Sequence, residues 1–156
     1  SNIMAIQVLN IQSWNISQKL SENFIVGEMI NSNTAISQKI LMQYVYQSEI
    51  LGNMKLFAKN VLQPAREQFK QEMFITSGYR CFQLNQAVNG AQNSLHLKGL
   101  AADIMVNSNR ARLIEIFKNM DLHELIIYPN FIHVSWKELW RENRQIVKGS
   151  PAQAFK

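Results

Sequence analysis

Apolar residues recur at helical spacing through the first half of the chain. Residues 34–47 and 49–70 both have this pattern, which predicts two amphipathic helices that form a packing layer. Pro64 interrupts the second pattern, and we expect a kink or a new turn there because a proline inside a helix removes a backbone hydrogen bond. The segment LSENFIVGEMI before them, residues 20–30, reads as a short capped helix or a turn.

The pattern changes to short apolar runs in the second half. Four runs predict strands, namely MFITS (73–77), LAADIMV (100–106), ELIIY (124–128) and FIHVSW (131–136). A turn and short helix ending at Gly90 and a helix over 109–119 separate them, and Pro129-Asn130 marks a turn between the last two. Helices come first and strands follow, which predicts an α+β fold. We expect one domain over residues 1–156, with a core at about 20–136 and a C-terminal tail.

Composition narrows the class of protein. The 156 residues are 47% hydrophobic and 17% charged, as in ordinary globular domains, and no apolar run is long enough to predict a membrane span. Cys81 is the only cysteine, so no internal disulfide forms. The net charge of +5 favours anionic polymers, but lysine and arginine are scattered along the chain, and we expect no nucleic-acid binding.

Two polar residues stand inside apolar strands. Asp103 lies in LAADIMV and His133 lies in FIHVSW, and each would cost a few kcal/mol to bury without a partner. Local hydrogen bonds would satisfy either residue taken alone. Together with His96, however, they supply two imidazoles and one carboxylate, which suit a catalytic zinc with three protein ligands and an open fourth position. Both interpretations are compatible with the sequence.

Several segments resemble a known family. SLHLKGLAAD, residues 94–103, is similar to the S-x-H-x-x-G-x-A-x-D signature of the zinc D-alanyl-D-alanine peptidases, which cleave bacterial cell-wall peptides. NFIVGEM, VLQPAREQF, ITSGYRCFQLNQAVNG and FIHVSW resemble the family's other segments in the same order. The resemblance implies a hedgehog/DD-peptidase-like fold, in which helices pack on a small antiparallel sheet. It also implies a zinc-dependent hydrolase acting on the peptide stems of peptidoglycan.

The resemblance assigns roles to individual residues. It implies that His96, Asp103 and His133 bind zinc, and that Arg80 holds a carboxylate or carbonyl oxygen of the substrate. The rigid fork of a guanidinium suits that task, although a surface arginine in a turn is the simpler interpretation. Ser94 matches the serine of the signature, and either lines the substrate groove or caps the loop.

Three glycines have an expected structural role. Gly78, Gly90 and Gly99 lie where the chain must turn, and glycine permits the positive φ that such turns use. A polar tail follows the core from Lys137 onward and contains Trp140. We expect this tail to pack loosely or to contact a partner.

The chain departs from the family at the general base. Peptide hydrolysis by a zinc enzyme needs a group that takes a proton from the zinc-bound water. In this chain Tyr128 stands where the family's glutamate is expected. Glu124 shares a strand face with His133 if the intervening turn has two or four residues, and would then stand diagonally from it, within reach of the metal water. Tyr128 would alternatively donate a hydrogen bond to a developing oxyanion. His123 is a weaker candidate for the base.

These features lead to one main hypothesis and two rivals. The main hypothesis is a zinc metallopeptidase of bacterial cell-wall peptides, and Tyr128 favours the first rival, a zinc-stabilised cell-wall binding module with impaired catalysis. The second rival is a metal-free structural domain. No signal peptide is visible, so we expect either release by lysis, as for a phage or mobile-element hydrolase, or a trimmed precursor. The bond cleaved, the choice between endopeptidase and carboxypeptidase, and the oligomeric state are not set by the sequence.

Overall fold

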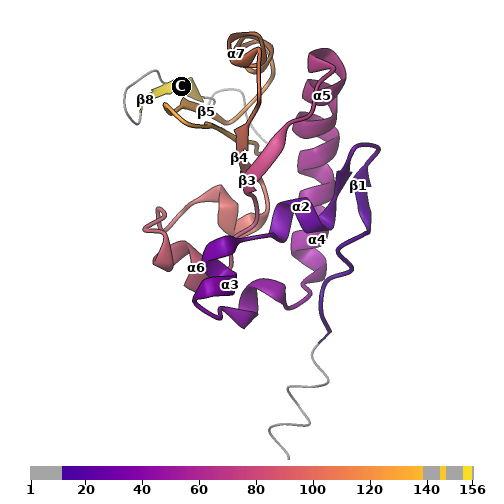
Figure 1. Ribbon diagram of the computed structural model, residues 1–156, viewed down its shortest axis with the longest axis vertical. Helices are drawn as coiled ribbons and strands as arrows, with labels where there is room; N and C mark the ends of the chain where they lie inside the picture. The colour runs from indigo at the N-terminus through magenta and orange to yellow at the C-terminus, as the bar shows by residue number, and fades with distance from the viewer. Residues whose placement is uncertain (1–11, 139–144, 147–152, 156) are drawn as a thin grey trace, which may run out of the picture.

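A computed structural model of the chain describes residues 12–138, 145–146 and 153–155. The strands are β1 (Lys19–Ser21), β2 (Phe24–Ile25), β3 (Phe74–Ser77), β4 (Ala101–Met105), β5 (Glu124–Ile127), β6 (Ile132–Ser135), β7 (Gln145–Ile146) and β8 (Gln153–Phe155). The helices are α2 (Val26–Ile30), α3 (Asn33–Ser37), η1 (Leu41–Tyr44), α4 (Ser48–Phe57), η2 (Ala58–Leu62), α5 (Gln63–Phe69), α6 (Phe82–Ala87), η3 (Leu95–Lys98) and α7 (Arg110–Lys118). Along the chain, the helices from α2 to α5 come before the larger sheet, which begins at β3 (Figure 1). This order confirms the α+β class.

The larger sheet positions the polar residues of the strands. Its described strands follow the order β3-β4-β6-β5-β7, and β8 also pairs with β5. The pairing is antiparallel except between β5 and β7. Asp103 of β4 lies directly opposite His133 of β6, and Ile126 of β5 lies opposite His133 on its other side. One row across the sheet therefore places the aspartate and the histidine on the same face.

The turn between β5 and β6 decides which face Glu124 occupies. Ile127 pairs with Ile132, so the connecting turn has four residues, 128–131. Side chains alternate along a strand, and Glu124 therefore shares the face of His133 and stands diagonally from it. Four residues is one of the two turn lengths for which Glu124 was expected to share the face of His133.

The helices supply the apolar layer. Helices α4 and α5 form one rod with the π-helical turn η2 between them (Figure 1). Pro64 lies at the start of α5, directly after the π-helical turn η2, so the helix changes its hydrogen-bond pattern just before the proline and then continues. Phe57 and Phe69 of this rod are completely buried, and each such side chain stabilises the fold by about 1.5–3 kcal/mol.

Two predicted elements differ from the structure. Residues 34–47 do not form one helix, because Lys39 adopts a left-handed conformation (φ 57) that separates α3 from η1. Within LSENFIVGEMI, the sequence interpretation found the helix α2 but missed the small hairpin of β1 and β2 before it.

All three glycines have the structural role that was expected, but the expected positive φ is found at one of them. Only Gly99 has a positive φ, of 73°, and it ends η3 just after His96. At Gly78 and Gly90 glycine is needed instead because neighbouring atoms leave no room for a side chain. A Cβ at Gly78 would lie 2.4 Å from the carbonyl oxygen of Met29, and one at Gly90 would lie 2.0 Å from Oδ1 of Asn85.

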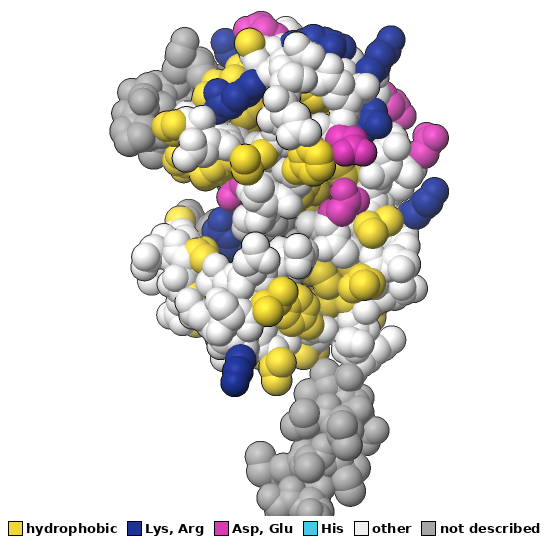
Figure 2. All heavy atoms as spheres, viewed as in Figure 1, with side chains coloured by type: hydrophobic (Ala, Val, Ile, Leu, Met, Phe, Trp, Pro, Cys, Tyr) yellow, Lys and Arg dark blue, Asp and Glu magenta, His cyan; other side chains and the backbone are white. Residues whose placement is uncertain are grey.

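The surface, the tail and the length of the helices each add one observation. On the face shown in Figure 2, lysine and arginine side chains are dispersed among acidic and polar ones. Of the predicted tail, β7 and β8 pair with β5 along the sheet, whereas Trp140 lies outside the described residues. None of the helices in the described part of the chain has the length and apolar character needed to traverse a bilayer.

Candidate functional site

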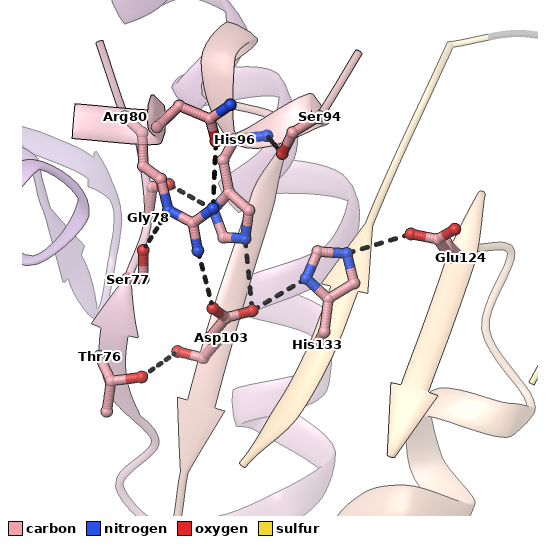
Figure 3. A network of polar contacts seen from close by, with 10 residues as sticks. Thr76, Ser77, Gly78, Arg80, Ser94, His96, Asp103, Glu124 and His133 are labelled. Carbon is pink, nitrogen blue, oxygen red and sulfur yellow. Dashed lines mark hydrogen bonds and ion pairs between the residues drawn. The ribbon is translucent and has the colours of Figure 1, made fainter. Parts of the chain in front are cut away.

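Three separate elements bring a group of potential metal ligands together. His96 comes from η3, Asp103 from β4 and His133 from β6 (Figure 3). One ligand atom from each residue can be chosen so that all three lie within 4.8 Å of one another. The sequence motif and the distant strand therefore meet at one point of the sheet.

His96 has a defined tautomer. Its side chain is buried, and Nδ1 lies 2.6 Å from the carbonyl oxygen of Gly78. A carbonyl oxygen only accepts, so Nδ1 carries the hydrogen and Nε2 has a free lone pair. Burial lowers the pKa of His96, more than the nearby Asp103 raises it, which favours this neutral form. The Nε2 atom has no hydrogen-bond partner among the described residues.

Asp103 and His133 form the second half of the cluster. His133 donates from Nδ1 to Oδ1 of Asp103 at 2.8 Å, and its Nε2 lies 3.2 Å from Oε1 of Glu124 (Figure 3). Burial opposes charge on both residues. It would raise the pKa of Asp103, but the hydrogen bond from His133 and the nearby imidazoles hold that pKa well below its usual range. Burial likewise lowers the pKa of His133, but the hydrogen bonds and charges of the two carboxylates raise it to about 9.

The arrangement fits a metal ion. Nε2 of His96 and Oδ1 of Asp103 lie 3.3 Å apart, and both present lone pairs. Two acceptors at this distance in a buried position repel each other unless a cation lies between them. Nitrogen and carboxylate oxygen donors in a group of three are the ligands of a catalytic zinc. The residues present are therefore suited to hold zinc.

Arg80 is part of the cluster and not a surface residue in a turn. Its Nη2 donates to Oδ2 of Asp103 at 3.3 Å, Nε donates to Ser77 and Nη1 donates to Asn85. Only 14% of its side chain is exposed. Burial lowers the pKa of Arg80 and the charge of Asp103 opposes that effect, so the guanidinium stays protonated and fixes the outer oxygen of the aspartate.

An open pocket lies over the cluster. Its lining includes all seven residues that the sequence analysis assigned to the site, namely Arg80, Ser94, His96, Asp103, Glu124, Tyr128 and His133. Ser94 is the N-cap of η3, and its hydroxyl accepts a hydrogen bond from the backbone N–H of His96. It therefore both caps the loop and lines the pocket. His123 also lines it.

Glu124 and Tyr128 both line the pocket but differ in chemistry and contacts. Among the described residues that line it, Asp103 and Glu124 are the only carboxylates. Tyr128 stacks on Phe131 with the ring centroids 4.4 Å apart, and Arg110 donates to the backbone carbonyls of both aromatic residues. Burial raises the pKa of Tyr128, and the charges of the two carboxylates raise it further, so its hydroxyl keeps its proton.

Sequence reasoning missed several residues that support the site. Asn85 of α6 is buried, accepts from Arg80 and donates to the carbonyl of Ala91. A polar residue beside Leu84 on the inward face of a short helix was the available signal. Ser77 and the carbonyl of Gly78 gave none, because the first is an ordinary strand residue and the second acts through its backbone.

Comparison with known proteins identifies one family. The model of a family described as Peptidase M15 matches residues 22–135, which include the whole cluster. This match confirms the resemblance that was read from the signature. The search of curated proteins found no match.

Proposed function

The chain belongs to the Peptidase M15 family of zinc D-Ala-D-Ala carboxypeptidases, and from this premise we propose that it is a zinc-dependent peptidase that hydrolyses amide bonds in peptidoglycan peptides. The main supporting observation is the buried Nε2 of His96, which faces the carboxylate of Asp103 without a hydrogen bond. We place its site of action at the bacterial cell wall.

Three residues would hold the metal. His96 would bind through Nε2, His133 through Nδ1, and Asp103 through its carboxylate. When bound, zinc supplies a Lewis acid that activates water and polarises an amide carbonyl. The contact between Glu124 and Nε2 of His133 resembles the carboxylate partners that fix the orientation of metal-binding histidines.

Arg80 and Ser94 would bind the substrate. Three of the five N–H groups of Arg80 are used by Ser77, Asn85 and Asp103, so two remain for a carbonyl or carboxylate oxygen in the pocket. The hydroxyl of Ser94 accepts from the backbone, and its own hydrogen is left for a substrate oxygen.

Glu124 would be the general base. It is the pocket carboxylate that does not belong to the ligand group, its side chain is partly exposed, and its Oε1 already contacts a ligand histidine. A proton taken from water by this carboxylate would then pass to the leaving amine. Tyr128, which stays protonated, would donate a hydrogen bond to the developing oxyanion.

The substitution Glu124→Gln tests this assignment. Glutamine keeps an oxygen that accepts from His133 but cannot take a proton, so kcat on muropeptides should fall by about 10²–10⁴-fold while zinc content is retained. Glu115→Gln serves as the matched control, because Glu115 is an exposed residue of α7. Equal kcat in the two variants would remove Glu124 from the mechanism.

A second function is favoured by one observation. Tyr128 occupies the expected position of the family's glutamate and is stacked on Phe131, and Glu124 is already engaged by His133. The same fold could therefore retain zinc and bind cell-wall peptides without cleaving them. The zinc-loaded parent protein would then co-sediment with purified peptidoglycan and release no peptide or amino acid from it.

A further inference from the structure

Gln43 is a fully buried polar residue outside the pocket. It comes from the short helix η1, and none of its surface is exposed. Burying a primary amide is unfavourable unless its hydrogen bonds are made. Both of its hydrogens and its oxygen are used, so its orientation is fixed completely.

Two of these hydrogen bonds join Gln43 to the backbone of the residues directly before and after Arg80. Nε2 of Gln43 donates to the carbonyl of Tyr79 at 2.7 Å, and its Oε1 accepts from the N–H of Cys81 at 2.8 Å. One side-chain amide thus binds the backbone on either side of Arg80, as a neighbouring strand would. A second bond from Nε2 to the carbonyl of Ile30, at 3.0 Å, anchors this amide to the end of α2.

The same backbone segment holds His96 at two points. The carbonyl of Gly78 accepts from Nδ1 of the imidazole at 2.6 Å, and the N–H of Arg80 donates to the carbonyl oxygen of His96 at 2.9 Å. Any shift of residues 78–81 would therefore move the imidazole and the guanidinium together. Gln43 is the side chain that fixes this segment from the opposite side.

We infer that Gln43 is a positioning residue, which orients His96 for metal binding and Arg80 for substrate binding by clamping the backbone of residues 78–81. It touches neither the ligand atoms nor the pocket, and it acts through the carbonyl of Gly78 and the backbone around Arg80. The inference rests on the proposed metal site for its functional consequence. Its structural part concerns the tautomer and orientation of His96, which can be observed without metal.

The test compares two buried glutamines. Gln43→Met keeps the length of the side chain and removes all three bonds. Gln63→Met is the matched control, because Gln63 of α5 is also buried and bonds Ser21 and Asn23 in the hairpin of β1 and β2, away from the pocket. Both variants lose a satisfied amide, and only the first loses contact with the segment that holds His96.

Two readouts separate positioning from general stability. Zinc affinity is measured by competition with a chelator, and the tautomer of His96 is measured in the metal-free protein by ¹H–¹⁵N NMR of the imidazole. We expect Gln43→Met to weaken zinc binding by about tenfold or more and to lose the single Nδ1–H tautomer. Gln63→Met should stay within about twofold of the parent in affinity and keep the tautomer. Gln43→Asn, a milder change, replaces Gln43→Met if that variant does not fold.

The outcomes are distinct. The inference is overturned if Gln43→Met, or Gln43→Asn in its place, matches Gln63→Met in both zinc affinity and tautomer. A parent that binds no zinc would instead contradict the proposed function. The tautomer comparison, made without metal, would still support or overturn the positioning role in that case.

Discussion

The substitution Gly78→Ala should damage both the fold and the site by an amount that follows from the structure. A Cβ at this position would lie 2.4 Å from the carbonyl oxygen of Met29 and 2.8 Å from its Cα, where ordinary contact begins at 3.4 Å. Both atoms belong to the backbone, so the two segments must separate by roughly 1 Å. That movement breaks the hydrogen bond from Tyr79 N–H to the same oxygen, now 2.7 Å long.

The expected cost combines two effects. Overpacking costs about 1–3 kcal/mol and the lost hydrogen bond about 1 kcal/mol, so the free energy of unfolding should fall by about 2–4 kcal/mol. In a chain of this size the melting temperature should drop by roughly 5–15 °C. Zinc affinity should fall as well, because the carbonyl of Gly78 orients His96.

Thermal and urea unfolding of the metal-free protein measure the first effect. Gly52→Ala is the matched control, since Gly52 lies inside α4 with nothing within 4 Å of the added methyl group. Alanine there should stabilise the helix by up to about 1 kcal/mol. The reasoning is refuted if Gly78→Ala unfolds like the parent and binds zinc equally well.

Three further predictions concern single features of the site. Asp103→Asn should reduce zinc content to background, and it should destabilise the metal-free protein because Arg80 loses its buried partner. Elemental analysis and urea unfolding measure the two effects, and retained zinc would contradict the first. In the metal-free protein the pKa of His133 is raised from 6.5 to about 9, so its stabilising contribution is complete below pH 6.5 and is lost as the pH rises through 9. Unfolding measured across that range should show falling stability, whereas zinc affinity should rise because the metal competes with a proton. Arg110→Met should speed hydrogen exchange of the Tyr128 amide about tenfold or more, because Arg110 donates hydrogen bonds to the carbonyls at both ends of the β5–β6 turn. Unchanged exchange would show that the turn is stable without Arg110.

The cluster of His96, Asp103 and His133 could be predicted from the sequence because its residues break local rules. An aspartate and a histidine inside apolar strands need partners, and the motif around His96 resembles a family signature. The register that brings Asp103 opposite His133 depends on pairing between distant strands. Strand parity limited the position of Glu124 to two cases, and only the observed four-residue turn decides between them.

Other features depend on contacts that a linear pattern does not contain. Lysine is not a residue that usually adopts a positive φ, so nothing in the sequence marks Lys39 as the break between α3 and η1. The need for glycine at position 78 comes from Met29, which is 49 residues away in sequence. Gln43 likewise acts on backbone 36 and 38 residues further along the chain.

The metal content of the purified protein tests the central claim most directly. Elemental mass spectrometry would be applied to protein prepared without added metal, with His96→Ala as the test variant and His123→Ala as the control from the same pocket. We predict about one zinc per chain in the parent and in His123→Ala, and little in His96→Ala. A parent that holds no zinc even after equilibration with the metal would contradict the account, and Nε2 of His96 would then need another partner.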